Sequence, residues 1–452
     1  MSGGLRGFLE RSRRAGVTIH SLQVNVGGRT VARHELPPFG TGVPHRMYSV
    51  SKTITALAVL LLVEEDRLRL DAPIATYFPE MGSVEPWLAE TRIDDMLAMT
   101  GPHSRTTFDD SGEWLASYFR RPPTHRPGTQ FVYDTSASYT LAALVERCAG
   151  VPLLEYLRPR LLEPLGIGSS ARFLTGPDGF SHGGSGLIAA PDDLLRLGET
   201  INGAGRFRGS RILPERVVRR LIERRADPGM QTWGAPFRAG YGRQMWLPRP
   251  GAWMMFGLGG QIVYGEPDRS LVAVVTADAT SLTGGDQRLV EMLLDALSHD
   301  HLDDAASLDV PLSCHDPAHS RTVAGEFVAV SGENAPTRVA LSLDADGGEL
   351  GIGDEPPLQF STRGPTVVEG ALGAGVVTAG WSHPGVLEVR LSAASDDISS
   401  VRLRIVATGD GVVTVQSQGS GPEIGAAWTW VGSYRPAGTR PSDSSPWVDS
   451  PA

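Results

Sequence analysis

Alternating apolar and polar positions open the chain and return near residue 250. Residues 21–34 alternate around Gly27 and Gly28, a pattern typical of a β-hairpin whose glycines supply the positive φ angles of a tight turn. Strand character returns at 253–256, 261–264 and 270–276, and a helix is expected at 287–297. These early and late segments together predict one mixed sheet.

Between the two strand regions the apolar spacing is helical. From Ser49 it continues to about Arg67, ahead of a polar turn at 71–73. Further helices are expected at the ranges 138–148, 153–162 and 192–201, the first closed by Gly150 and the last by Gly203. The middle third is therefore expected to be mostly helical, with a strand region leading into a buried helix.

A different pattern begins after His299. Residues 301–319 carry Asp, Ser and Pro and are predicted to be a linker that ends a first domain at about residue 300. Beyond it, short runs with strand character alternate with glycine-containing turns; they lie at 339–343, 350–353, 386–391, 401–407, 412–416 and 428–434. They predict a small antiparallel barrel or sandwich, lipocalin-like, over 320–436, followed by a flexible tail at 437–452.

Composition narrows the class of protein. The 452 residues are 41% hydrophobic and 20% charged, as in ordinary folded proteins, and the length predicts two or three domains. The formal net charge of −10 disfavours a nucleic-acid partner, whose phosphates it repels. Cys148 and Cys314 lie far apart, so neither a disulfide framework nor a metal-binding pair is expected. We expect no metal and no cofactor.

The sequence also bears on location. The longest apolar stretch, residues 54–63, is about half of the roughly twenty residues that a membrane span needs. Residues 1–17 contain arginines but also Glu10, and no apolar run follows them, so they do not have the pattern of a secretory signal. We therefore expect a soluble cytoplasmic protein without a membrane partner.

The first chemical motif is Ser49-Val50-Ser51-Lys52 at the start of the expected buried helix. A spacing of three puts the lysine amine one turn along, on the same face as the serine hydroxyl. Backbone N–H groups at a helix start are unpaired and favour developing negative charge. A lysine buried there shifts toward its neutral form, which is what a general base requires. The same residues also fit a helix N-cap at Ser49, so the motif alone leaves both interpretations open.

The surrounding blocks resemble the serine beta-lactamase-like superfamily. They occur in order at 48–53, 67–74, 93–100, 127–133, 144–150 and 184–194, and the resemblance spans roughly residues 15–300. This superfamily contains class C beta-lactamases, D-alanyl-D-alanine carboxypeptidases, D-aminopeptidases and related esterases and transacylases. The resemblance implies an α+β fold in which a helical subdomain packs on an antiparallel sheet flanked by helices. It places the active site in the groove between them, with Ser49 as the nucleophile.

The second motif of the superfamily is a tyrosine followed two residues later by asparagine, and here it reads Tyr133-Asp134-Thr135. By resemblance, Tyr133 shares the proton relay with Lys52, as a phenol or a phenolate. Thr135 is expected to contact the substrate where an amide normally holds the substrate carbonyl. A hydroxyl offers fewer donors than an amide, which points to a different acyl group.

The third motif, normally Lys-Thr-Gly or His-x-Gly, corresponds to the stretch 256–261, where Leu258 takes the cationic or imidazole position. By resemblance, Leu258, Gly259 and Gly260 line the substrate, because a bare backbone lets substrate lie close along the strand. The backbone N–H groups of Ser49 and Gln261 are expected to form the oxyanion hole.

The leucine in this motif affects substrate choice. Without a cation, recognition of a substrate carboxylate is weakened, so the protein is not expected to be a true beta-lactamase. Arg243 is one candidate for a replacement cation from elsewhere in the chain.

The expected reaction is a two-step acyl transfer from a small-molecule ester or amide to Ser49 and then to a second nucleophile. If that nucleophile is water, the protein is a hydrolase. If it is an amine, the protein is a transacylase, or an amide-forming or cyclising enzyme of natural-product biosynthesis. A non-catalytic ligand-binding protein on the same fold is a further alternative, and the sequence does not set the oligomeric state.

Overall fold

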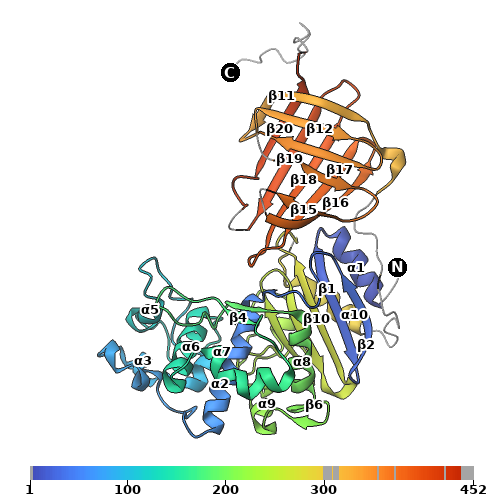
Figure 1. The fold of residues 1–452 in the computed structure, drawn as a ribbon. Coiled ribbons are helices and arrows are strands. Elements are labelled where there is room, and N and C mark those ends of the chain that lie inside the picture. Colours follow the sequence, from blue (N-terminus) through green and yellow to red (C-terminus); the bar gives the residue numbers. More distant parts are fainter. Residues whose placement is uncertain are drawn as a thin grey trace. The chain divides into compact units, whose positions relative to one another are not determined.

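The computed structural model describes residues 4–282, 284–298, 308, 315–353, 356–370, 373–421 and 424–438. The chain divides into two compact units, residues 1–310 and 311–452 (Figure 1). Most of the expected linker at 301–319, and all of the expected tail except 437 and 438, lie outside the described residues.

A five-stranded sheet in the order β2-β1-β10-β9-β8 organises the first unit. Its strands are β1 Thr18–Val26, β2 Arg29–Glu35, β8 Trp253–Gly257, β9 Gln261–Glu266 and β10 Leu271–Asp278. The segments from the two ends of the unit pair directly, since β1 lies beside β10. The expected hairpin is present, with φ of +57° at Gly27 and +77° at Gly28. The expectation of a mixed sheet was wrong: every neighbouring pair is antiparallel, because hairpins join β1 to β2 and β8 to β9 to β10.

Helices cover both faces of this sheet. α1 (Gly4–Arg14) and α10 (Arg288–Leu297) pack together on one face, and α8 (Pro191–Asn202) packs on β9 and β10 from the other (Figure 1). Alternate residues of β10 serve the two sides: Val275 joins the core that contains α10, and Val274 joins the core that contains α8. Because successive side chains of a strand point to opposite faces and both faces are covered, β10 is buried along its whole length.

The helical part of the unit surrounds α2 (Ser51–Glu64), which is buried on all sides from Ser51 to Leu62 and mainly apolar. Such a helix is stable only inside a core, and α2 packs against α6 (Thr135–Ala149), α7 (Leu153–Leu157) and α9 (Glu215–Ile222). The remaining helices are α3 Pro86–Glu90, α4 Ile93–Leu97 and α5 Trp114–Arg120. Short strands complete the unit: β3 His45–Arg46, β4 Arg172–Phe173, β5 Leu187–Ala189, β6 Arg206–Phe207 and β7 Ser210–Arg211.

One helix departs from its expected form. The pattern predicts a single helix at 153–162, but α7 ends at Leu157 and the chain continues as a wider π turn, Arg158–Leu162. Pro159 lies inside this turn. Because proline has no N–H and its ring crowds the preceding turn, a regular α-helix cannot continue through it.

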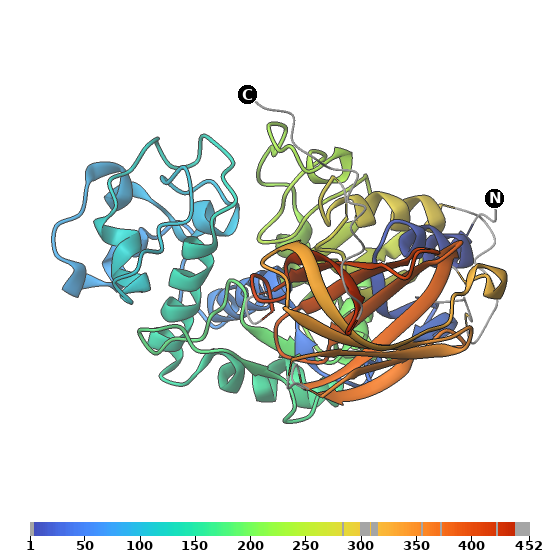
Figure 2. The ribbon, with the colours of Figure 1, turned by 90° about the horizontal axis from the view of Figure 1, so that it is seen from above.

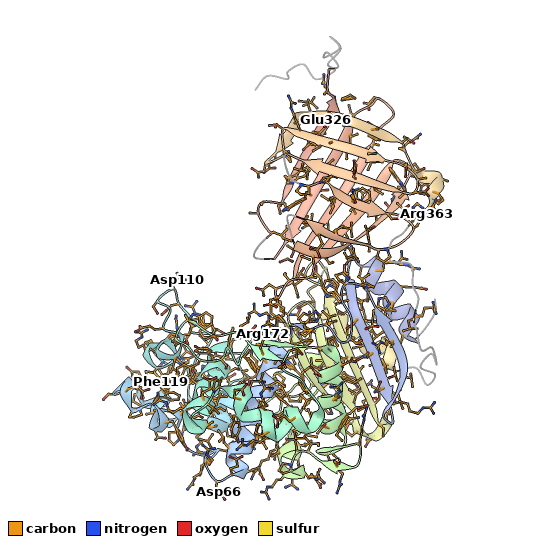
Figure 3. The ribbon with its side chains drawn as sticks, viewed as in Figure 1. Asp66, Asp110, Phe119, Arg172, Glu326 and Arg363 are labelled. Atoms are coloured by element: carbon orange, nitrogen blue, oxygen red, sulfur yellow. The ribbon has the colours of Figure 1, made fainter. Side chains whose placement is uncertain are left out.

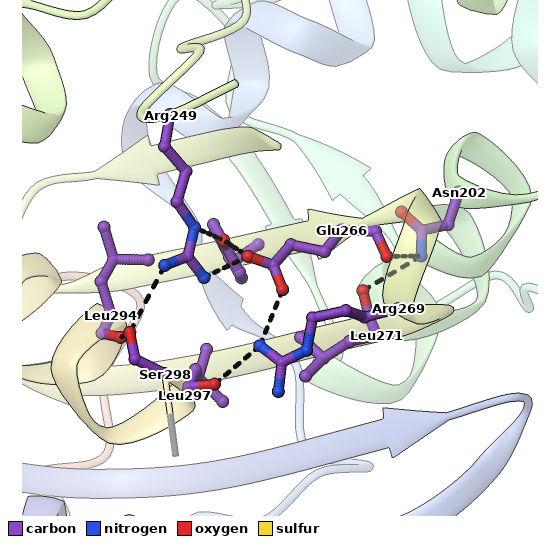
Figure 4. Close-up of polar contacts among 9 residues, drawn as sticks. Asn202, Arg249, Glu266, Arg269, Leu271, Leu294, Leu297 and Ser298 are labelled. Carbon is purple, nitrogen blue, oxygen red and sulfur yellow. Dashed lines mark hydrogen bonds and ion pairs between the residues drawn. The ribbon is translucent and has the colours of Figure 1, made fainter. Parts of the chain in front are cut away.

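A buried carboxylate fastens the end of α10 to the sheet. Glu266 is hydrogen-bonded by Arg249, and Arg269 Nη1 lies 2.8 Å from Glu266 Oε2 (Figure 4). Arg269 also donates to Leu297 O at 2.7 Å, and Arg249 to Ser298 Oγ at 3.4 Å. Both cations thus meet the carboxyl end of α10, where they offset the helix dipole.

The second unit is a ten-stranded antiparallel sheet that curves into a nearly closed barrel (Figure 2). The strand order is β14-β13-β12-β11-β20-β19-β18-β17-β16-β15. The strands are β11 Val323–Glu333, β12 Arg338–Leu343, β13 Gly347–Ile352, β14 Leu358–Ser361, β15 Thr366–Gly370, β16 Gly373–His383, β17 Val386–Ala393, β18 Ser399–Ala407, β19 Val413–Ser420 and β20 Trp430–Pro436.

The expected barrel or sandwich is confirmed as a barrel, but four strands were missed. All six expected runs are present, as β12, β13 and β17–β20. β11 presents mostly exposed side chains, β16 begins with small residues, and β14 and β15 are short, so none shows a clear apolar alternation.

Side chains fill the interior of the barrel. Trp381, Trp430 and Tyr434 are among the buried residues of its core. Charged side chains such as Glu326 and Arg363 lie at the surface of this unit (Figure 3).

Within the described residues, every helix is too short or too polar to cross a lipid bilayer. The same residues contain no cluster of three or more His, Cys, Asp or Glu side chains arranged to hold a metal ion.

Candidate active site

Ser49 lies in a 3-10 turn, Tyr48–Val50, that leads directly into α2. Tyr48 has φ +46°, an uncommon backbone conformation for a residue with a side chain. The turn is fixed by Ser51, whose hydroxyl donates to Tyr48 O at 2.5 Å and accepts the Leu187 N–H at 2.8 Å. Because Ser49 lies in the first turn of this helical segment, no preceding turn supplies a carbonyl for its N–H.

Lys52 is buried one turn along α2. Its Nζ lies 3.0 Å from Ser49 Oγ, 2.7 Å from Gly184 O and 3.2 Å from Thr135 Oγ1. Burial lowers the pKa of Lys52 to about 7, although the charge of Asp134 acts in the opposite direction. A neutral amine has two N–H donors and one lone pair. If the donors serve Gly184 O and Thr135 Oγ1, the lone pair is left for the Ser49 hydroxyl.

Tyr133 completes the group around the serine. Its hydroxyl lies close enough to that of Ser49 to influence its ionisation, and Lys52 Nζ lies 4.7 Å from its ring centroid. Burial raises the pKa of Tyr133 far above its usual range, more than the interaction with Ser49 lowers it. Of the two forms considered from the sequence, the phenol is therefore the one that this environment stabilises.

The start of α6 holds Thr135 in place. Its N–H donates to Thr106 Oγ1 at 3.0 Å, and the preceding Asp134 caps the helix by accepting the Ser136 N–H at 2.8 Å. Burial raises the pKa of Asp134 to about 6, opposed by its bonds from Ser136 and by the charge of Lys52. This buried carboxylate near Lys52 was not identified from the sequence, although it stands inside the second motif.

The glycines of the third motif differ in what they pack against. A Cβ on Gly257, at the end of β8, would collide with Met47 O, so this glycine is the one packed against the turn that carries Ser49. A Cβ on Gly260 would instead lie 2.6 Å from Leu289 Cδ2 in α10. The residue that follows the packed glycine is therefore Leu258, three positions before Gln261.

The structure brings four of the expected site residues together in one cluster: Ser49, Lys52, Tyr133 and Thr135. The other expected residues belong to the third motif. Of these, the Leu258 side chain is 54% exposed, whereas Gly259 and Gly260 are buried.

Gln261 belongs with the buried glycines. It lies inside the sheet, where its Nε2 donates to Leu258 O at 3.2 Å and to Ala277 O at 2.8 Å. These contacts explain the presence of Gly259, Gly260 and Gln261 at these positions by packing and hydrogen bonding alone, without any contact with a substrate.

Arg243 is occupied elsewhere. Its Nε lies 2.6 Å from Asp94 Oδ1 and its Nη1 lies 2.9 Å from Glu223 Oε2, and its side chain is buried. Releasing a buried arginine from two carboxylates would leave uncompensated charge. Arg243 is therefore unsuited to replace the missing cation of the third motif.

Aromatic rings flank the cluster on two sides. Trp233 meets the Tyr133 ring edge-on, with centroids 5.2 Å apart. Phe108 and Trp114 stack at 4.1 Å and contact His182, whose pKa burial lowers to about 4, with the charge of Lys52 acting in the same direction. Phe108, Trp114 and Trp233 lie in or beside loops without periodic spacing, so they could not be predicted from the sequence pattern.

Comparison with known proteins identifies the first unit. Residues 5–296 match the family model Beta-lactamase. Esterase EstB of Burkholderia gladioli is 27% identical over 263 residues, which cover 43% of this chain and 65% of EstB, so the chain spans less than two thirds of that relative.

Solved structures extend the likeness in fold. EstCE1, described as a hydrolase with promiscuous acyltransferase activity, matches with a TM-score of 0.52 and 18% identity over 65% of this chain and 97% of its own. The octameric penicillin-binding protein homologue from Pyrococcus abyssi matches with a TM-score of 0.53 and 14% identity, over 94% of this chain and 98% of its own. Because the family model matches well over half of the sequence, from α1 into α10, the chain belongs to the beta-lactamase family.

Proposed function

We propose that the first unit is a serine acyl-transfer enzyme that hydrolyses an ester or amide of a small molecule through an acyl-enzyme on Ser49. The observation that carries this proposal is the contact between Ser49 Oγ and Lys52 Nζ at 3.0 Å, with burial lowering the lysine pKa to about 7. A nucleophile beside a base that is neutral near physiological pH is the arrangement that acyl transfer requires.

In the first step the Ser49 oxygen attacks the substrate carbonyl while its proton passes to Lys52 Nζ. Tyr133, held as a phenol, donates to the developing charge on the serine oxygen. As the tetrahedral intermediate collapses, the leaving group takes a proton from Tyr133, which Lys52 replenishes. Water then attacks the acyl-enzyme by the reverse of these transfers.

For the oxyanion hole we propose the backbone N–H groups of Ser49 and Leu258. Gln261 was the donor expected from the sequence. The proposal moves to Leu258 because Leu258 directly follows Gly257, whose backbone packs against Met47 beside the nucleophile turn. Backbone donors fixed in this way stabilise negative charge on the carbonyl oxygen without having to reorient.

We propose a neutral acyl donor with an apolar or aromatic part. Leu258, whose side chain is 54% exposed, directly follows β8, where the superfamily presents a cation or imidazole. Phe108 and Trp233 are half-buried rings beside the cluster. A free carboxylate would lose a charge-assisted hydrogen bond worth roughly 1.5–3 kcal/mol.

The direct test is covalent labelling. The full-length protein is treated with a fluorophosphonate and its intact mass is measured, alongside turnover of a p-nitrophenyl acyl ester. We expect one adduct on the native protein and neither adduct nor ester turnover with Ser49→Ala. Full labelling of Ser49→Ala would refute the nucleophile assignment, and an unlabelled native protein would favour a non-catalytic ligand-binding role.

Substrate class is tested by competition. Ester donors should acylate the enzyme more than about tenfold faster than nitrocefin or benzylpenicillin, because of the interaction lost at Leu258. Efficient turnover of nitrocefin would contradict a neutral donor.

Transacylation is the second candidate function. It is favoured by the likeness to EstCE1, whose description joins hydrolase and acyltransferase activity. A panel of amines at millimolar concentration separates the two functions by product: amide formed in preference to acid indicates a transacylase, including the amide-forming or cyclising enzymes of natural-product biosynthesis, and acid alone indicates a hydrolase.

A further inference from the structure

The turn between β8 and β9 is held by hydrogen bonds on almost every side. Gly260 N–H donates to Gly257 O at 3.2 Å, and Gly259 O accepts the Ala279 N–H at 3.0 Å. Gly259 and Gly260 have φ of +77° and +91°, which favour glycine. In the described part of the chain, the Leu258 N–H makes no hydrogen bond.

The peptide that follows Leu258 is fixed at both of its polar ends. Its carbonyl, Leu258 O, accepts from Gln261 Nε2 at 3.2 Å, and its N–H, on Gly259, donates to Asp286 Oδ2 at 2.6 Å. Both side chains are held in place by their surroundings. Gln261 is also bonded to Ala277 O, and Asp286 is buried just before α10.

Asp286 is a charged residue that is almost completely removed from water. It is only 7% exposed, and burial raises its pKa while the surrounding N–H groups oppose that shift. Its position just before α10 links the turn to a helix that is itself fastened to the sheet. Removing a carboxylate from water is unfavourable, so the hydrogen bond that Asp286 accepts from the Gly259 N–H must help to compensate for this burial.

We propose that Asp286 is a positioning residue for the oxyanion hole: by holding the Gly259 N–H, it keeps the neighbouring Leu258 N–H aimed at the substrate carbonyl bound at Ser49. This inference rests on the proposed function, since it concerns the same acyl-transfer site. Asp286 acts through the backbone and does not touch the substrate. Gln261 supports the same peptide from its other end.

The test compares four full-length proteins in ester hydrolysis: native, Asp286→Ala, Asp286→Asn and Asp278→Ala. Asp286→Ala should lower kcat on the order of 10- to 100-fold, somewhat less than the loss of a whole oxyanion donor, with KM changed by less than about threefold. Asp286→Asn retains an oxygen acceptor for the Gly259 N–H and should recover most of the lost rate.

Asp278→Ala is the matched control. Asp278 is 5% exposed and likewise binds a local N–H, that of Thr280 at 3.1 Å, but not the turn at Leu258. Its loss should lower thermal stability without lowering kcat. Equal losses of kcat in Asp278→Ala and Asp286→Ala would reduce the effect to general destabilisation and overturn the proposal.

A second readout reports the oxyanion hole itself. A boronic acid that forms a tetrahedral adduct with Ser49 should bind Asp286→Ala more weakly by about the same factor as kcat falls, while KM does not move. Native kcat and native boronate affinity in Asp286→Ala would refute the inference while leaving the Ser49 proposal intact. If Asp286→Ala does not fold, Gln261→Met removes the other support and should give the same pattern. Normal values for that variant would count against the proposal.

Discussion

At the scale of single residues, the proposed chemistry depends on one buried lysine. Lys52 has a hydroxyl, a backbone carbonyl and a threonine oxygen around its amine. Among the residues that the structure describes, no carboxylate hydrogen-bonds to this amine, and Asp134 acts on it through its charge. Desolvation therefore outweighs attraction, and the amine is ready to accept a proton near neutral pH.

This environment predicts the pH dependence of catalysis. Ester hydrolysis, measured as kcat/KM from pH 5 to 9, should rise along an acid limb with an apparent pKa near 7, because only neutral Lys52 accepts the serine proton. Lys52→Arg keeps the positive charge but cannot deprotonate, so it should be nearly inactive. If Lys52→Arg keeps most of the activity, or if the acid limb lies near the roughly 10.4 of free lysine, Lys52 is not the base.

The same residue predicts a pH dependence of folding. The folded pKa of Lys52 is lowered to about 7, so between about 7 and the roughly 10.4 of the unfolded chain the unfolded state binds a proton that the folded state lacks. This group therefore makes the free energy of unfolding rise with pH through that window, by on the order of a few kcal/mol. Below about pH 7 Lys52 is charged in both states, and the folded state keeps the full unfavourable contribution of burying that charge.

Lys52→Met removes this contribution. Urea unfolding at pH 6 and pH 9 should show a smaller increase in stability for the variant than for the native protein. The comparison between the two proteins cancels the other titrating groups. An identical increase in both would show that the lysine is not shifted in the folded state.

At the scale of elements, the contacts of Glu266 determine how α10 sits on the sheet. Burial would raise the pKa of Glu266, but hydrogen bonds from Tyr264 and Arg269 and the charge of Arg249 bring it below its ordinary value. One carboxylate thus joins β9, the turn before β10 and the end of α10. The helix that carries Leu289 against Gly260 depends on this contact.

Replacing this carboxylate tests that role. Glu266→Gln should lower the free energy of unfolding by about 1–3 kcal/mol, because it leaves two arginines without their partner. Since the folded pKa of Glu266 is lowered, its contribution is present above the unfolded value and is lost as the pH falls through the folded value. Denaturant unfolding should therefore show a gap between native and variant proteins at pH 7 that narrows toward pH 3; a constant gap would contradict the ion-pair explanation. Glu388→Gln, in an exposed pair on the barrel, is the control and should change little.

At the scale of the whole molecule, the two units have separate cores. The buried residues of the barrel form one cluster, and those of the first unit form two others. Each unit thus has the apolar interior that a domain needs to fold alone.

This division predicts that a chain ending at Val310 stays folded. It should unfold in one cooperative thermal transition and keep fluorophosphonate labelling at Ser49, because all groups of the proposed site come from the first unit. The full chain with the same buffer and probe is the reference. Aggregation of the shortened chain, or loss of labelling with the fold retained, would show that the barrel unit completes the catalytic one.

The elements with strong periodicity and the order of the motifs could be predicted from the sequence alone. The hairpin at Gly27, the buried helix after Ser49 and the cap at Gly150 follow from local spacing and turn chemistry, and these are set by neighbouring residues. The matches to Ser49, Lys52 and Tyr133 were likewise found from short linear motifs.

Contacts between distant segments could not be predicted in this way. The packing of Gly257 against Met47 joins positions about two hundred residues apart, and in a stretch with three nearby glycines the local sequence gives no preference for which of them makes that contact. The pairing of Asp286 with Gly259, the engagement of Arg243 with Asp94 and the aromatic rings around Tyr133 arise in the same way. The side chain sets which reactions a residue can take part in, but its partners, its burial and hence the shift of its pKa from the unfolded value arise only when the chain folds.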